Sequence, residues 1–186
     1  YAGTSAAVTT SYGVLACPWS IVDMVGGSSP APATYFANGT DVLVRYRSGT
    51  LTTLSASCST KTSAETSFRA YSRSGPKPRA ICVQSPDKRL VAAGTASAGG
   101  PNGVTSYDSR VWFSQPEDAE KWDETDYVDL GYDGQKITAA VSCGNQVFVF
   151  KKTKMFVFYG NSTDADGGTV FNYRAVDNAF PGNDTE

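Results

Sequence analysis

Eight carboxylates crowd one stretch of the chain and form its most conspicuous chemical feature: Glu117, Asp118, Glu120, Asp123, Glu124, Asp126, Asp129 and Asp133. Two carboxylates about 5–10 Å apart across a sugar-binding cleft could hydrolyse a glycosidic bond. Here the acidic residues follow one another in a single connector instead of arriving from separate strands. The pattern therefore favours a solvated loop, with an electrostatic contact between subunits as the alternative.

A second candidate for ion binding lies near the C-terminal end. Asp164, Asp166 and Gly167 are spaced like part of a calcium loop, in which short carboxylates surround a hard cation. However, Ser162 occupies the first ligand position, and Tyr173 stands where a bidentate glutamate belongs. The segment therefore predicts a plain hairpin turn.

Basic and glycine-rich segments could contact phosphate. The basic residues fall in two clusters, Lys151, Lys152 and Lys154 in one and Arg69, Arg73, Lys77 and Arg79 in the other. Either cluster could make weak, non-specific contacts with nucleic acid, but ordinary exposed turns are the simpler interpretation. Residues 94–103 are rich in glycine but contain neither GxxxxGK[ST] nor GxGxxG, so they predict a flexible loop.

The sequence contains no histidine, which removes the usual general base near neutral pH and every Ser-His-Asp or Cys-His arrangement. Cys17, Cys58, Cys82 and Cys143 are too widely spaced for a CxxC motif. Cys82 and Cys143 lie in apolar, strand-like runs, so we expect buried thiols, with disulfides as the alternative. We predict no catalysis, no catalytic or cofactor-binding residues, no cofactor and no metal site.

Composition bounds the class of protein. A chain of 186 residues favours one domain, over residues 1–186. A formal charge of −2 argues against general nucleic-acid binding, and no apolar run approaches the roughly 20 residues that span a bilayer. The first residues lack the basic start of a signal peptide, and the missing initial Met suggests a processed or partial chain.

The elements that must position these residues are strands. Apolar runs of four to six residues, β-branched or aromatic and bounded by turn residues, recur along the chain: 20–25, 42–46, 79–83, 89–92, 110–113, 147–150 and 155–159. Ser48-Gly49 and Lys151–Lys154 are each placed to turn one hairpin. The second hairpin is apolar at nearly every strand position, which predicts cover on both faces. Only residues 116–125 suggest a short helix, because Pro116 precedes Glu117-Asp118.

An internal repeat organises the strands. Residues 39–51 and 144–156 share the order polar turn, apolar strand, basic turn and second strand, and a weaker copy begins at Pro86. The copies centre near Val42, Leu90 and Val147, at spacings of roughly 50 residues, which is typical of four-stranded propeller blades. The repeat predicts an all-β fold of three or four antiparallel β-propeller blades, or a segment of a larger propeller.

One ordered set of segments resembles a known family. The segments are 109–122 (SRVWFSQPEDAEKW), 126–131 (DYVDLG), 133–139 (DGQKITA), 147–151 (VFVFK) and 155–160 (MFVFYG), followed by 170–178. This order resembles the propeller blades of tailed-bacteriophage virion proteins, particularly tail-tube and nozzle proteins of short-tailed phages. The resemblance covers residues 109–180, whereas residues 1–108 are supported only by the internal repeat.

The resemblance implies a non-enzymatic structural subunit of the virion tail. Such subunits form a homo-oligomeric ring around the path of the DNA, next to other tail or portal-adaptor proteins, with at most non-specific contact with the genomic DNA.

The aromatic residues also have an interpretation that does not depend on the resemblance. Trp112 and Phe113 are expected to pack on opposite faces of one strand, and Trp122 is expected to pack as well. Trp19, Tyr35 and Tyr107 leave open a carbohydrate- or receptor-binding domain, and the carboxylates leave open a weaker glycosidase reading.

Overall fold

The computed structural model describes residues 19–25, 32–39, 43–53, 59–60, 77–85, 87–96, 106–131, 133–163 and 169–176. Within these ranges the chain forms strands and no helix, as the short β-branched and aromatic runs predict. The strands are β1 (Ser20–Val25), β2 (Pro32–Ala37), β3 (Val44–Arg47), β4 (Thr50–Thr53), β5 (Ser59–Thr60), β6 (Lys77–Gln84), β7 (Arg89–Ala96), β8 (Ser106–Gln115), β9 (Asp118–Asp129), β10 (Ile137–Cys143), β11 (Gln146–Lys151), β12 (Met155–Thr163) and β13 (Thr169–Val176).

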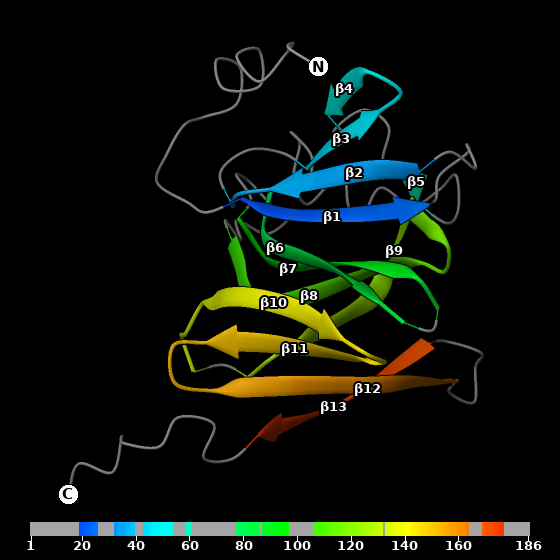
Figure 1. Cartoon of the computed structure of the whole chain (residues 1–186). Coiled ribbons are helices and arrows are strands. Elements are labelled where there is room, and N and C mark those ends of the chain that lie inside the picture. Colours follow the sequence, from blue (N-terminus) through cyan, green and yellow to red (C-terminus); the bar gives the residue numbers. More distant parts are fainter. Residues whose placement is uncertain are drawn as a thin grey trace, which may run out of the picture.

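The strands form three sheets that follow one another along the chain (Figure 1). The first sheet has the order β1-β2-β3-β4, the middle sheet β5-β9-β8-β7-β6, and the third sheet β10-β11-β12-β13. Each sheet is an antiparallel meander, except that β5 joins β9 in parallel. The prediction of an all-β fold is confirmed as three antiparallel sheets of four to five strands.

The first strands of the three meanders lie beside one another. β6 contacts β1 on one side and β10 on the other (Figure 1). The Ser20 hydroxyl donates to Ile81 O at 2.9 Å and accepts from Ile81 N at 3.0 Å, and Gly39 N donates to Pro78 O at 2.7 Å. These bonds fix the first sheet against β6.

The middle sheet is buried on both faces. In β7, Leu90 and Ala92 lie in a core shared with the first sheet, whereas Val91 and Ala93 lie in a core shared with the third sheet. Since successive side chains of a strand point to opposite faces, a continuous apolar run suits a strand covered on both sides. The predicted opposite orientation of Trp112 and Phe113 is confirmed, because each lies in a different core.

Both predicted hairpins are confirmed. Ser48 and Gly49 have φ values of 48° and 82° and connect β3 to β4, the positive pair that a tight two-residue turn requires. The second hairpin joins β11 to β12 through a hydrogen bond of 2.8 Å from Lys151 N to Lys154 O. Within the described chain, however, another sheet covers only one face of this hairpin.

The predicted short helix over residues 116–125 is wrong. Pro116 and Glu117 form a turn, and residues 118–129 form the strand β9. Glu117 has a φ of 58°, and its amide donates to Asp87 O and Lys88 O, so the turn is held by the neighbouring β6–β7 connection. Pairing with β8 therefore outweighs the local preference of a proline followed by acids. No helix in the part of the chain that the structure describes could cross a membrane.

The internal repeat places one copy in each sheet, but in different strands. The copies near Leu90 and Val147 correspond to β7–β8 and β11–β12, the second and third strands of their meanders. The copy near Val42 corresponds to β3–β4, the third and fourth strands, and Val42 itself lies outside the described residues. The sequence similarity therefore marks hairpins and not equivalent positions in the three sheets.

Candidate functional site

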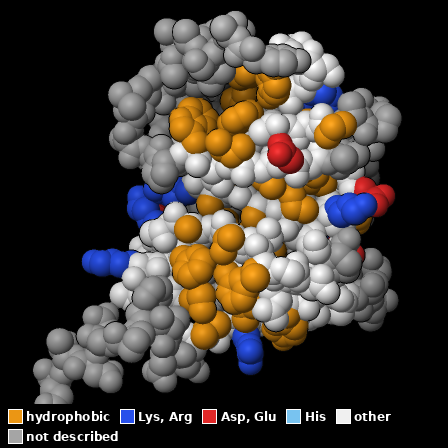
Figure 2. All heavy atoms as spheres, viewed as in Figure 1, with side chains coloured by type: hydrophobic (Ala, Val, Ile, Leu, Met, Phe, Trp, Pro, Cys, Tyr) orange, Lys and Arg blue, Asp and Glu red, His pale blue; other side chains and the backbone are white. Residues whose placement is uncertain are grey.

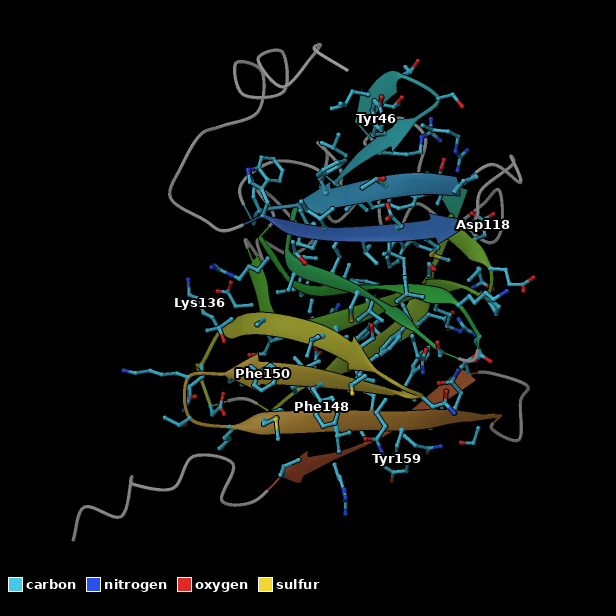
Figure 3. The ribbon with its side chains drawn as sticks, in the orientation of Figure 1. Tyr46, Asp118, Lys136, Phe148, Phe150 and Tyr159 are labelled. Atoms are coloured by element: carbon cyan, nitrogen blue, oxygen red, sulfur yellow. The ribbon has the colours of Figure 1, made fainter. Side chains whose placement is uncertain are left out.

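The outer face of the third sheet, which points away from the middle sheet, is apolar. Strand pairing places its side chains in two rows across β10, β11 and β12: Val141, Phe148 and Val157 in one, Ala139, Phe150 and Met155 in the other. Val141 is 48% exposed, and Tyr159, further along β12, is 51% exposed, whereas Val157 is buried. Figure 2 shows apolar side chains gathered over these strands, and Figure 3 places Phe148, Phe150 and Tyr159 there.

The outer face of the first sheet carries a comparable row of apolar side chains, although its Val44 is buried and the exposed polar pair Asp23 and Thr34 lies on the same face. Ile21, Phe36 and Val44 form a row across β1, β2 and β3, as Val141, Phe148 and Val157 do across β10, β11 and β12. Ile21 is 58% exposed and Tyr46, on β3, is 40% exposed. The ring of Trp19 packs edge-on against Phe36, at 6.4 Å between centroids. Both ends of the three-sheet array therefore carry exposed apolar side chains.

A hollow of about 440 Å³ lies where β8 and β9 meet the connection to β10. Its lining residues are Tyr107, Asp108, Ser109, Arg110, Asp129, Gly131 and Gly134. Asp108 pairs with Arg79 at 3.1 Å and with Lys136 at 3.3 Å. The wall thus combines an aromatic ring with carboxylates that already have cationic partners.

Arg110 is held rigidly in this wall. Its Nε and Nη2 donate to the two oxygens of Asp129 at 2.7 and 2.8 Å, the bidentate geometry that suits a guanidinium. The guanidinium carbon lies 3.6 Å from the ring centroid of Tyr127 and 4.3 Å from that of Tyr107. Burial alone would lower the pKa of Arg110, but the hydrogen bonds and charge of Asp129 raise it overall.

The acidic run is not a solvated loop, and this prediction is wrong. Glu120 and Asp126 are buried in β9, where each pairs with an arginine from another strand. Arg45 Nη1 lies 2.5 Å from Glu120 Oε1, and Arg89 Nη1 lies 3.1 Å from Asp126 Oδ2. Because β9 packs against the first sheet and shares the middle sheet with β7, its carboxylates meet cations that are distant in sequence. Glu117 and Asp133 are exposed, Asp118 and Asp129 are partly exposed, and the side chains of Asp123 and Glu124 lie outside the described set.

Polar networks connect the sheets. Tyr35 donates to Glu120 at 3.3 Å, and Arg47 lies 3.6 Å from the same oxygen, so Glu120 of the middle sheet holds three side chains of the first. Burial and the negative charge of Glu120 raise the pKa of Tyr35. On the other side Gln84 donates to Asn161 of β12 at 2.9 Å. Both interfaces therefore combine apolar packing with specific polar contacts.

The predicted basic clusters occupy different environments. Lys152 is exposed, but Lys151 is fully buried, so the prediction of an exposed turn is wrong for Lys151. Its Nζ donates to Leu130 O and to Asp133 at 2.8 Å. Val147, Val149 and Lys151 alternate along β11, so the period-two pattern already placed Lys151 on the inner face. In the other cluster Arg79 is half-buried, whereas Arg69, Arg73 and the Lys77 side chain lie outside the described set.

The other predicted site residues are the calcium-like loop at residues 164–168 and three aromatic side chains. β12 and β13 pair at Thr163 and Thr169, as a hairpin requires, although residues 164–168 lie outside the described residues. No group of three or more acidic or cysteine side chains in the described ranges could hold a metal ion. Of the three aromatic residues considered for sugar stacking, Tyr35 is buried, Trp19 is half-buried and Tyr107 lines the hollow.

The cysteine predictions are confirmed in part. Cys82 is a buried free thiol, and burial raises its pKa to about 12. Cys143 is exposed, because it ends β10 beside the turn at Gly144-Asn145, so the prediction of a buried thiol is wrong there. Cys17 and Cys58 lie outside the described residues. The packing prediction for Trp122 is confirmed, since this side chain is fully buried.

Comparison of the chain with known protein families, curated proteins and solved structures found no match. No protein-family model matches the chain, and neither a curated protein nor a solved structure matches it significantly. The functional argument therefore depends on the two outer faces, the hollow and the contacts between the sheets.

Proposed function

We propose that the chain is a structural component of a bacteriophage tail, of the nozzle or tube type, that forms a ring around the DNA path. In this proposal its sheets are β-propeller blades, its partners are further copies and other tail or portal-adaptor proteins, and its contact with DNA is non-specific. The chain has no catalytic role, and its location is the virion tail.

The order of strands supports the comparison with blades. Propeller blades are four-stranded antiparallel sheets arranged around an axis. Here β1, β6 and β10 each begin a meander and lie beside one another, while the later strands lead away from them. The three sheets of the described residues are fewer than the roughly four to eight blades of a closed propeller, so closure requires further sheets.

The observation that carries the proposal is the pair of apolar outer faces. An internal blade, such as the middle sheet, is covered on both sides. The first and third sheets both carry exposed apolar side chains on the side where the described residues supply no neighbouring sheet. Exposed apolar side chains gathered on one face favour an interaction surface, and such surfaces suit a protein whose role is assembly.

Particles that contain the chain provide the test. Electron microscopy of such particles should locate it in the tail, as a symmetric ring of several copies. Native mass spectrometry of the assembly released from them should give a multiple of the mass of the intact chain. Location outside the tail, or release as a single 19.7 kDa chain, would contradict the proposal.

The hollow beside Arg110 supports a second candidate, a carbohydrate- or receptor-binding domain. Its volume falls in the range of small-ligand sites, and Tyr107 could stack on a sugar ring. The carboxylates of Asp108 and Asp129 disfavour an anionic ligand. Because each of them already pairs with an arginine, the site has no free negative charge to attract a cationic ligand either. A neutral saccharide therefore fits best. Saturation-transfer NMR with maltotriose and chitotriose tests this candidate. Tyr107→Ala should abolish a binding signal that the control Tyr46→Ala retains.

A further inference from the structure

We propose that Arg110 selects the ligand of the hollow where β8 and β9 meet the connection to β10, and that this ligand is a neutral saccharide with two adjacent hydroxyl groups. The inference deepens the second candidate function and rests on it, because it names the contact that decides which saccharide binds. It does not depend on the proposed role in a virion tail.

One edge of the Arg110 guanidinium is open to a ligand. A guanidinium carries five N–H donors in a planar fork. Asp129 accepts two of them, from Nε and Nη2, at 2.7 and 2.8 Å. Nη1 donates to no group among the described residues, so the edge formed by Nη1 and Nη2 keeps its donors. Because Arg110 lines the hollow, a ligand there can accept two hydrogen bonds side by side.

The guanidinium is oriented before a ligand arrives. Its carbon lies over the rings of Tyr127 and Tyr107, and the Arg110 side chain is only 13% exposed. These contacts and the two hydrogen bonds to Asp129 restrict its rotation, so binding does not have to order it. Since the rings take up the face of the guanidinium, a ligand meets its edge.

The charges of the wall favour uncharged acceptors. Asp129 balances the charge of Arg110, and Asp108 pairs with Arg79 and with Lys136, which is labelled in Figure 3. A cationic ligand would meet an edge that only donates hydrogen bonds. An anionic ligand would lie beside the carboxylates of Asp108 and Asp129. Two adjacent hydroxyl oxygens of a sugar ring provide paired acceptors without charge.

Two glycines help to keep the hollow open. Gly131 and Gly134 line it with φ values of 66° and 71°, which side chains rarely adopt. No described atom lies within 4 Å of the Cβ position at either residue. The hollow of about 440 Å³ therefore keeps room for a sugar ring next to Arg110.

A matched series of sugars tests the inference on the unaltered protein. Methyl α-glucoside has adjacent hydroxyls, its 3-deoxy form has no adjacent pair, and the corresponding glucuronide adds a negative charge. NMR titration should show that the glucoside binds at least tenfold more tightly than the 3-deoxy form, because the latter leaves a partly buried donor without an acceptor. The glucuronide should bind more weakly than the glucoside. Equal binding of the glucoside and its 3-deoxy form, or tighter binding of the glucuronide, would overturn the inference.

Three variants separate the role of Arg110 from effects on folding. Arg110→Lys keeps the charge but removes the paired donors, so it should weaken glucoside binding at least tenfold and abolish discrimination against the 3-deoxy form. Asp129→Asn leaves the charge of Arg110 unbalanced, so the preference should shift towards the glucuronide. Arg174→Lys is the matched control, because Arg174 is exposed on β13 and does not line the hollow. Circular dichroism and thermal unfolding verify the folds. Discrimination that survives in Arg110→Lys, or that is lost in Arg174→Lys, would contradict the assignment.

Failure of this inference can be told apart from failure of the proposed functions. Maltotriose binding together with equal binding of the glucoside and its 3-deoxy form overturns the role of Arg110 but retains the second candidate function. Absence of every saccharide signal contradicts both. Neither result bears on a ring in the virion tail, which electron microscopy of particles decides.

Discussion

Trp112 and Phe113 are consecutive residues of β8, yet they belong to different hydrophobic cores. Trp112 packs toward the first sheet beside Leu90 and Trp122. Phe113 packs toward the third sheet, where its ring stacks on Phe171 with centroids 3.8 Å apart. One strand thus couples three sheets, because alternate side chains serve opposite faces.

Truncating either side chain should destabilise the whole domain. We expect Trp112→Ala and Phe113→Ala each to lower the free energy of unfolding by about 3–5 kcal/mol, because each leaves a cavity in a closed core. Urea denaturation followed by fluorescence and by circular dichroism measures both values. Tyr159→Ala, at a position 51% exposed, should change the value by less than about 0.5 kcal/mol. A loss below about 1 kcal/mol for Phe113→Ala would show that the third sheet does not pack on β8.

Glu120 should contribute far more to stability than Glu117, although both belong to the same acidic run. Glu120 contacts Arg45, Arg47 and Tyr35 with a side chain only 10% exposed, whereas Glu117 is 74% exposed and lies 3.6 Å from Lys88. Glu120→Gln removes the negative charge that Arg45 contacts at 2.5 Å and that lies 3.6 Å from Arg47, both partly buried, so we expect a loss of about 3 kcal/mol. Glu117→Gln is the matched control and should cost less than about 0.5 kcal/mol. Equal effects of the two substitutions, measured by urea denaturation, would contradict this assignment.

The strands were predictable from sequence because their signals are local. Apolar runs, turn residues and period-two alternation identified the hairpin at Ser48-Gly49 and the two-sided strand containing Trp112 and Phe113. The alternation of Val147, Val149 and Lys151 places the lysine on the buried face of β11. The neighbouring lysines Lys152 and Lys154 favoured the prediction of an exposed turn instead. Pairing with β8, which turned a predicted helix into β9, depends on residues outside the segment itself.

The contacts of the site were less predictable, because they join residues that are far apart in the chain. Glu120 lies 75 residues from Arg45, and Gln84 lies 77 residues from Asn161. A run of acids in the sequence reports charge but not which cations approach it. The apolar run of β11 likewise predicted cover by sheets on both faces, whereas among the described residues another sheet covers only the inner face.

Asp133 should make stability depend on pH in the acidic range. The hydrogen bond from the buried Lys151 lowers the pKa of Asp133 to about 2 from 3.8, so the stabilisation is present above about pH 4 and is lost as the pH falls towards 2. We expect Asp133→Asn to cost about 1 kcal/mol at pH 6, allowing for solvent screening of a partly exposed carboxylate. The difference from wild type should shrink as the pH is lowered to 2.5. A difference that stays constant in urea titrations between pH 6 and 2.5 would contradict the assigned ion pair.

Cys82 and Cys143 should differ sharply in reactivity. The thiolate is the reactive form, and burial raises the pKa of Cys82 to about 12, so this thiol is both shielded and protonated at pH 8. Cys143 is exposed at the end of β10. Iodoacetamide at pH 8, followed by peptide mass spectrometry, should therefore modify Cys143 at least tenfold faster than Cys82. In 6 M urea the two rates should converge, because unfolding exposes both thiols. Rapid modification of Cys82 in the native protein would mean that the interface between the middle and third sheets opens readily.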